Sequence, residues 1–275
     1  MAFNLTAQQK LMQKLFREVA QAEVKENAAD VDEKERFPKE NVEIMRQAKM
    51  LGIPYPREYG GAGADYLSYI LAVEELSKTC ATTGVVLSAH TSLGTWPIAQ
   101  YGTPEQKEKF LRPLASGEKL GAFGLTEPNA GTDAAGQQTT AVLDGDEYVL
   151  NGTKIFITNA GEADVYIIFA MTDKSKGTRG ISAFIVEKDT PGFTVGQHEK
   201  KLGIRGSATS ELIFNNCRIP KENLLGKEGQ GFKVAMTTLD GGRIGIAAQA
   251  LGIAEGALEE TVKYVKESKQ FGRQI

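Results

Sequence analysis

The sequence predicts an α+β protein with an N-terminal helical domain, a middle antiparallel β domain and the start of a C-terminal helical-bundle domain. Three observations support this class. Apolar residues recur at helical spacing up to about residue 118, β-rich runs separated by turn signals follow, and one long helical run begins near Gly229. We therefore expect domain boundaries at 1–118, 119–228 and 229–275, with the last domain incomplete.

The N-terminal segment carries first amphipathic and then continuously apolar helical patterns. Thr6 and Gln9 are spaced for a capping box, and the charged run VKENAADVDEKERFP is expected to end this first helix. Gly52 is placed to end a second helix. Residues 66–102 are too continuously apolar for a surface helix, so we expect buried helices there.

The middle segment changes from helical periodicity to short β-rich runs. Asp144-Gly145 separates two such runs and predicts a two-residue hairpin loop. Further runs follow with regularly spaced turns, which is typical of a small antiparallel β domain rather than of alternating βαβ units. The glycine-rich stretch GAFGLTEPNAGTDAAG, residues 121–136, therefore lacks the βαβ setting of a Rossmann phosphate loop.

The C-terminal segment reads as one long helix interrupted by glycines. Gly241, Gly242 and Gly245 each disfavour a helix by roughly 1 kcal/mol relative to alanine, so we expect close approach by another helix or a ligand. One helix cannot bury an apolar face alone, and we expect a further helical domain to be missing or supplied by another chain. The apolar face is expected to consist of Phe232, Met236, Leu239, Ile246 and Ile253.

Composition and termini limit the function classes. The formal net charge of −3 and the pI near 5.7 give no basic field for nucleic acid. No apolar run approaches the ~20 residues of a membrane span. The start MAFNLTAQQK lacks signal- and transit-peptide features, so we expect a cytoplasmic protein of bacterial type, a mitochondrial matrix location being less expected. Cys80 and Cys217 are expected to be reduced and buried, and the two isolated histidines predict no metal site.

The residues themselves suggest a binding site but leave alternatives open. The loop over 121–136 offers backbone N–H groups together with the Thr126 and Thr132 hydroxyls. Phe156 and Thr158 are expected on one face of a strand, because side chains alternate with period two. An aromatic ring beside a hydroxyl suits the face and edge of a flat heterocycle. Equally, Phe156 could be sheet core and the loop an ordinary turn.

Several long motifs resemble the acyl-CoA dehydrogenase family. They are GLTEPNAGTDAAG, NGTKIFITNAGEADVYIIFAMT, GIRGSATSELIFNNCRIPKENLLGKEGQGF and LDGGRIGIAAQALGIA. The similarity is greatest to the short-chain, butyryl-CoA type members and spans essentially the whole chain. It implies a flavoprotein oxidoreductase of fatty acid metabolism that uses FAD to form the α,β double bond of a short-chain acyl-CoA. It further implies electron transfer to an electron-transferring flavoprotein and a homotetramer.

Two other functions remain open beside this one. An enoyl-CoA reductase working in the reverse direction has the same site. A non-catalytic FAD- or acyl-CoA-binding fragment, or more remotely a structural helical–β interaction domain, has the same sequence signals.

The resemblance also implies which residues bind the ligands. The implied cofactor-binding residues are Phe123, Gly124, Leu125, Thr126, Glu127, Pro128, Asn129, Ala130, Gly131, Thr132, Phe156, Ile157 and Thr158. The implied substrate-binding residues are Thr132, Asp240, Gly241, Gly242 and Arg243. On this interpretation the glycines of the last helix belong to a substrate-contacting turn.

This sequence departs from the family at two places. Relatives take a glutamate base either from the distal helical region or from the position before the arginine that matches Arg243, and here that position is Gly242. We therefore expect no catalytic base within 1–275 and no turnover by this polypeptide alone. Relatives also carry an arginine for the FAD diphosphate of a neighbouring subunit where this chain has Ser268, although Lys269 or Arg273 could supply charge.

Overall fold

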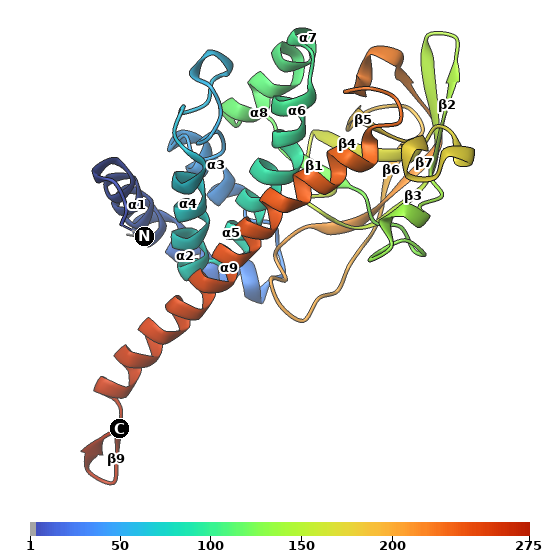
Figure 1. Cartoon of the computed structure of the whole chain (residues 1–275). Coiled ribbons are helices and arrows are strands. Elements are labelled where there is room, and N and C mark those ends of the chain that lie inside the picture. Colours follow the sequence, from blue (N-terminus) through green and yellow to red (C-terminus); the bar gives the residue numbers. More distant parts are fainter. Residues whose placement is uncertain (1–3) are drawn as a thin grey trace.

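The computed structural model describes residues 4–275 and contains a helical domain, a β-sheet domain and one long helix that crosses both (Figure 1). The long helix, α9, starts beside the sheet, runs over the helical domain and extends beyond it. A small hairpin at its far end carries the C-terminus. The predicted fold class is confirmed.

The helical domain follows the predicted order with two differences in helix boundaries. The capping box of Thr6 and Gln9 is present. The elements are α1 (Ala7–Val19), η1 (Ala20–Val24), α2 (Lys25–Glu33), α3 (Lys39–Gln47), η2 (Arg57–Tyr59), α4 (Tyr66–Thr79), α5 (Ala81–Ser88), η3 (Ala89–Thr95), α6 (Trp96–Tyr101), α7 (Pro104–Gln106), η4 (Lys107–Leu111) and α8 (Arg112–Ser116). As predicted, α4, α5 and η3 are largely buried.

The prediction that the charged run ends the first helix is wrong. The chain continues from α1 through the π-helical turn η1 into α2, because Val24 and Val31 provide buried contacts while the charged side chains remain on the outer face. Gly52 does not end α3 either. Lys49 takes the left-handed conformation there, with φ of 58°. Gly52 is needed for close packing instead, since a Cβ at this position would lie 1.9 Å from the Ala115 carbonyl oxygen.

The β domain is an eight-stranded sheet in the order β6-β7-β3-β2-β4-β5-β8, with β1 paired to β4. Its strands are β1 (Gly121–Gly124), β2 (Thr140–Asp144), β3 (Glu147–Thr158), β4 (Val165–Met171), β5 (Ile181–Glu187), β6 (Phe193–His198), β7 (Thr209–Pro220) and β8 (Leu224–Leu225). Three short 3₁₀ turns lie between them: η5 (Ala134–Gly136), η6 (Lys174–Gly180) and η7 (Lys221–Asn223). Cys217 in β7 and Cys80 after α4 are buried free thiols, as predicted.

The sheet differs from a purely antiparallel one at β1. This strand pairs with β4 in parallel, and β2 touches β4 in parallel through Thr140 and Met171. Parallel neighbours need a long connection, which the loop after β1 and the β2–β3 hairpin provide. The hairpin loop itself consists of Gly145 and Asp146, one residue later than predicted, because Asp144 pairs with Glu147.

The long helix α9 (Gly231–Glu267) buries glycines where large apolar side chains were expected. A Cβ at Gly252 would lie 2.3 Å from the Glu74 carbonyl oxygen, and one at Gly256 would lie 2.4 Å from that of Lys78. The opposite side of the helix is exposed and includes Ile244, Ile246, Leu251, Ile253, Leu258, Val262 and Tyr264. The expected face is therefore correct only in its first part. No helix within residues 4–275 combines the length and apolar character needed to cross a membrane. Two short strands, β9 (Lys269–Gln270) and β10 (Arg273–Gln274), form the terminal hairpin.

His90 connects the helical domain to the sheet. Its ring is fully buried, and its Nδ1 accepts a hydrogen bond from the Gly121 N–H at 3.0 Å. The other nitrogen, Nε2, therefore carries the proton and donates to the Leu114 carbonyl oxygen at 3.2 Å. Burial lowers the pKa of His90 to about 4, against weaker opposing effects of its backbone hydrogen bonds. The histidine has a structural role here.

Acid should destabilise the fold through His90. Its pKa is lower in the folded than in the unfolded chain, so the unfolded chain binds more protons between about pH 4 and pH 6.5. Stability from this group is fully present above pH 6.5 and should fall by roughly 3 kcal/mol as the pH decreases to 4. Urea unfolding across this range should show a smaller pH dependence for His90→Asn than for wild type. His198→Asn, at an exposed position, is the control, and an equal effect of the two substitutions would contradict the prediction.

Candidate functional site

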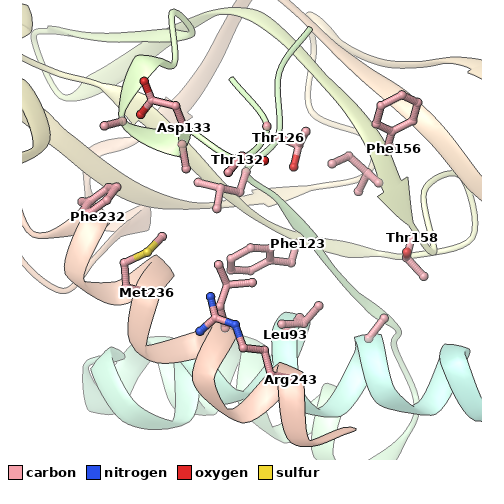
Figure 2. Close-up of a pocket in the computed structure, with 17 residues that line it drawn as sticks. Leu93, Phe123, Thr126, Thr132, Asp133, Phe156, Thr158, Phe232, Met236 and Arg243 are labelled. Carbon is pink, nitrogen blue, oxygen red and sulfur yellow. The ribbon is translucent and has the colours of Figure 1, made fainter. Parts of the chain in front are cut away.

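A cavity of about 500 Å³ lies between the sheet, the end of the buried helices and α9. Its walls come from η3, β1 and the loop that follows, the end of β3, and the first turns of α9 (Figure 2). The lining residues are Ala89, Leu93, Phe123, Leu125, Thr126, Gly131, Thr132, Asp133, Ala134, Ala135, Phe156, Ile157, Thr158, Phe232, Met236, Leu239 and Arg243. Four distant segments of the sequence therefore meet at one site.

The structure brings most of the predicted site residues together at this cavity. Those that line it are Phe123, Leu125, Thr126, Gly131, Thr132, Phe156, Ile157, Thr158 and Arg243. Gly242 lines an adjoining apolar cavity of about 280 Å³, which shares Leu93, Thr158 and Arg243 with the first. The predicted residues that line neither cavity are Gly124, Glu127, Pro128, Asn129, Ala130, Asp240 and Gly241.

Phe156 lies at an irregular position of β3. The pairing of β3 with β7 shifts register between Lys154 and Ile157, and Phe156 has a left-handed φ of 59°. Such a conformation costs a non-glycine residue on the order of 1–3 kcal/mol, which the surrounding structure must offset. The result is a phenylalanine that is 60% exposed while its neighbour Ile157 is buried. The sheet-core alternative for Phe156 is therefore excluded, and its ring lies on the same side of the cavity as Thr158 (Figure 2).

The loop after β1 forms a tight turn with free donors. Glu127 and Ala130 exchange two backbone hydrogen bonds of 3.1 Å, and the Thr126 carbonyl oxygen accepts from the Ile155 N–H at 2.8 Å. Within residues 4–275, the N–H groups of Thr126, Gly131 and Thr132 have no backbone hydrogen-bond partner. Residues that line the cavity thus carry free backbone donors and two threonine hydroxyls.

Glu127 forms an ion pair with a lysine that was not among the predicted site residues. Lys154 is fully buried, and its Nζ lies 2.7 Å from the Glu127 Oε1. Burial lowers the pKa of Lys154 to about 8, although Glu127 opposes this effect. Burial also raises the pKa of Glu127, but Lys154 and the N–H of Gln138 outweigh it, and the pKa of Glu127 is lowered overall. A charged residue within the apolar run KIFIT was the available signal, because a buried lysine needs an anionic partner.

On α9, the glycines near the cavity lie close to the buried helices. A Cβ at Gly241 would lie 2.9 Å from the Tyr66 hydroxyl, and one at Gly242 would lie 2.8 Å from Leu93 Cδ2. At both glycines α9 therefore lies close to side chains of α4 and η3. The Arg243 Nη1 pairs with the Asp240 Oδ1 at 2.8 Å, and Figure 2 shows the Arg243 side chain below Phe123.

Sequence models of one family match nearly the whole chain. They describe the N-terminal domain, the middle domain and the C-terminal domain of acyl-CoA dehydrogenase, and match residues 6–118, 122–217 and 229–275. The chain belongs to the acyl-CoA dehydrogenase family. A short-chain specific acyl-CoA dehydrogenase of Clostridium acetobutylicum is 65% identical over 275 residues, which is 100% of this chain and 73% of that protein.

Solved structures agree with this assignment. A chain in a structure described as the electron transferring flavoprotein of Acidaminococcus fermentans matches with a TM-score of 0.98 and 59% identity, over 100% of this chain and 72% of that one. Butyryl-CoA dehydrogenase from Megasphaera elsdenii matches with a TM-score of 0.94 and 54% identity, over 100% and 73% of the two chains. An acyl-CoA dehydrogenase from Bacillus anthracis complexed with FAD matches with a TM-score of 0.91 and 38% identity, over 98% and 46%.

Phe156→Ala should reduce flavin affinity with little loss of stability. The ring is exposed, so its removal leaves no core cavity, but aromatic packing on a ligand contributes on the order of 1 kcal/mol beyond area burial. We expect a roughly fivefold or greater increase in the FAD dissociation constant. Phe271→Ala, at another exposed phenylalanine, is the control. Unchanged FAD affinity combined with a large drop in the urea midpoint would mean that Phe156 acts in folding instead.

Proposed function

We propose that this chain acts as a short-chain acyl-CoA dehydrogenase that binds FAD in the cavity between β1, β3 and α9. The observation that carries the proposal is the cavity itself. It joins the Phe123–Thr132 loop to Phe156–Thr158 in a chain that is 65% identical to a short-chain specific relative. We also propose the domain division 1–118, 119–228 and 229–275, and the ligand-binding roles given above for the cavity-lining residues.

The residues present fit a flavin. Phe123, Leu125 and Ile157 give apolar walls, which suit the faces of a flat ring system. Hydroxyls of Thr126 and Thr158 and the free N–H groups of the loop suit its polar edge. Nothing lies within 4 Å of a Cβ built at Gly131, which lines the cavity, so no protein atom crowds the turn there. FAD would supply the hydride acceptor of the reaction.

The chain's own residues would bind and orient the acyl-CoA thioester. The adjoining apolar cavity, lined by Val85, Leu93 and Ile246, suits a short acyl chain. Arg243 at the edge of both cavities can donate to an anionic or carbonyl oxygen of the substrate. The α-proton becomes acidic when the thioester oxygen is hydrogen-bonded, which requires donors in a water-poor site. Asp133 is the one carboxylate among the residues that line the main cavity within 4–275.

The partners and location complete the proposal. We propose electron transfer to an electron-transferring flavoprotein, because the Acidaminococcus fermentans structure that the chain resembles is described by that name. A homo-oligomer, as a tetramer, fits the exposed apolar side of α9. A cytoplasmic location fits the bacterial relative.

Spectral titration with butyryl-CoA tests the substrate assignment. In FAD-reconstituted protein, butyryl-CoA should change the flavin absorbance saturably. The dissociation constant from this titration should be lower for butyryl-CoA than for octanoyl-CoA. Arg243→Lys should weaken this response about tenfold, because one hydrogen bond to a charged group contributes roughly 1.5 kcal/mol and lysine lacks the planar fork. Lys263→Arg on the same helix is the control. A response that does not depend on Arg243 or on acyl length would reject the assignment.

A further inference from the structure

A buried charge network joins the two sides of the cavity. The Lys154 Nζ donates to three acceptors: the Leu125 carbonyl oxygen at 3.1 Å, Glu127 Oε1 at 2.7 Å and Gln137 Oε1 at 3.1 Å. Lys154 belongs to β3, whereas its three partners belong to the loop between β1 and β2. One ammonium group therefore contacts the loop near both of its ends.

The network continues from these partners to the cavity wall. Gln137 Nε2 donates to the carbonyl oxygen of Ala134, which lines the cavity. The Glu127 carboxylate accepts from the N–H groups of Gln138 and Thr139, at 2.5 and 3.0 Å. The loop segment between these anchor points carries Thr126 and Gly131–Ala135, all of which line the cavity.

The same lysine also lies at the irregular part of β3. Phe156 and Ile157 lie two and three residues after Lys154 in the strand. The register shift between β3 and β7 begins at Lys154. Its side-chain stem packs where Gly124 has no side chain, since a Cβ at Gly124 would lie 3.6 Å from Lys154 Cγ. Lys154 is thus fixed by β1, by the loop and by its own strand.

We propose that Lys154 is a positioning residue that holds both walls of the flavin cavity at their working separation. It acts through the Leu125 carbonyl oxygen, Glu127 and Gln137 on one wall, and through the β3 segment bearing Phe156 on the other. A buried ion pair adds little net stability compared with apolar residues of similar size, so fold stability alone does not explain its presence. Its presence is explained by the cavity wall that it anchors. The inference rests on the proposed FAD site for its ligand. The effect of Lys154 on the loop can be measured independently in the FAD-free protein.

The decisive variant removes both charges together. Lys154→Met leaves an unpaired buried carboxylate and is expected to unfold the chain in part, whereas the double variant Lys154→Met/Glu127→Gln keeps an oxygen that accepts the backbone N–H groups. Hydrogen exchange of the apo protein should show at least tenfold faster exchange for amides of 126–135. FAD should bind at least tenfold more weakly, while the urea midpoint stays near that of wild type. The control is Arg17→Met/Glu75→Gln, which removes an ion pair between α1 and α4 away from the cavity.

Each outcome decides the proposal. Unchanged loop exchange together with FAD affinity within twofold of wild type overturns it. Should the double variant not fold, Gln137→Met removes one acceptor of Lys154 together with the Gln137 Nε2 donor to Ala134. The proposal then requires at least threefold faster exchange at 133–136 with no change at 126–127, and equal exchange at both ends overturns it. Failure of the wild-type protein to bind FAD would reject the proposed function. The role of Lys154 would still be tested by comparing hydrogen exchange of residues 126–135 between the FAD-free wild type and the variant.

Discussion

Gly94→Ala should lower the free energy of unfolding by about 3 kcal/mol and abolish flavin binding. A Cβ at Gly94 would lie 2.5 Å from the Gly121 carbonyl carbon and 2.7 Å from its Cα, and both are backbone atoms that cannot rotate away. The strand β1 and the helical segment η3 must therefore separate. These elements carry Phe123 and Leu93, so the separation should open the cavity as well as weaken the fold.

Urea unfolding and FAD titration of the same samples measure this effect. Alanine is otherwise favoured over glycine in a helix by roughly 1 kcal/mol, so a loss of stability must come from the contact. Gly203→Ala is a suitable control, because nothing lies within 4 Å of a Cβ at that position. Wild-type stability of Gly94→Ala would mean that β1 and η3 are not in this close contact.

Polypeptide 1–275, reconstituted with FAD, should oxidise butyryl-CoA at least ~10²-fold more slowly than the Clostridium acetobutylicum relative, since general-base catalysis typically contributes 10²–10⁴ in rate. Two other carboxylates near the site, Glu127 and Asp240, are engaged in ion pairs. Glu127 is paired with buried Lys154, and Asp240, which is exposed, is paired with Arg243. Neither lines the cavity.

Dye-coupled turnover with saturating butyryl-CoA measures the rate, and a chimera carrying the remainder of that relative is the positive control. The chain covers 73% of the relative, so the chimera restores its full length. Comparable rates for the two proteins would contradict the prediction. Asp133→Asn would then show whether the carboxylate at the cavity edge is the base.

Local sequence signals predicted much of the fold. The capping box at Thr6, the buried helices α4 and α5, and the position of the long helix follow from patterns of neighbouring residues. The predictions were wrong where contacts between distant segments determine the extent of a helix or the pairing of a strand. The charged run is helical over Lys25–Glu33 because Val31, and Val24 just before it, are buried on its inner face. The parallel pairing of β1 depends on a strand distant in sequence, which no local period reveals.

The site was predictable in part, for a similar reason. The loop and β3 residues came from motifs that are continuous in sequence, and most of them meet at the cavity. Leu93 and Met236 come from other segments, and their convergence with the loop requires the three-dimensional fold. The glycines of α9 show why sequence alone is not enough. Glycine at these positions is expected both for a substrate-contacting turn and for a close contact between helices. The ligand-binding roles themselves stay predictions.

Equilibrium dialysis of the apo protein against FAD, followed by the flavin absorbance spectrum, tests the central claim most directly. The proposed cavity predicts saturable binding of one FAD per chain, a perturbed flavin spectrum, and a further change when butyryl-CoA is added. It also predicts weaker binding for Phe156→Ala and normal binding for Phe271→Ala. Flavin that dialyses away with the spectrum of free FAD, at concentrations where the folded chain is intact, would contradict the assignment of this cavity as a flavin site.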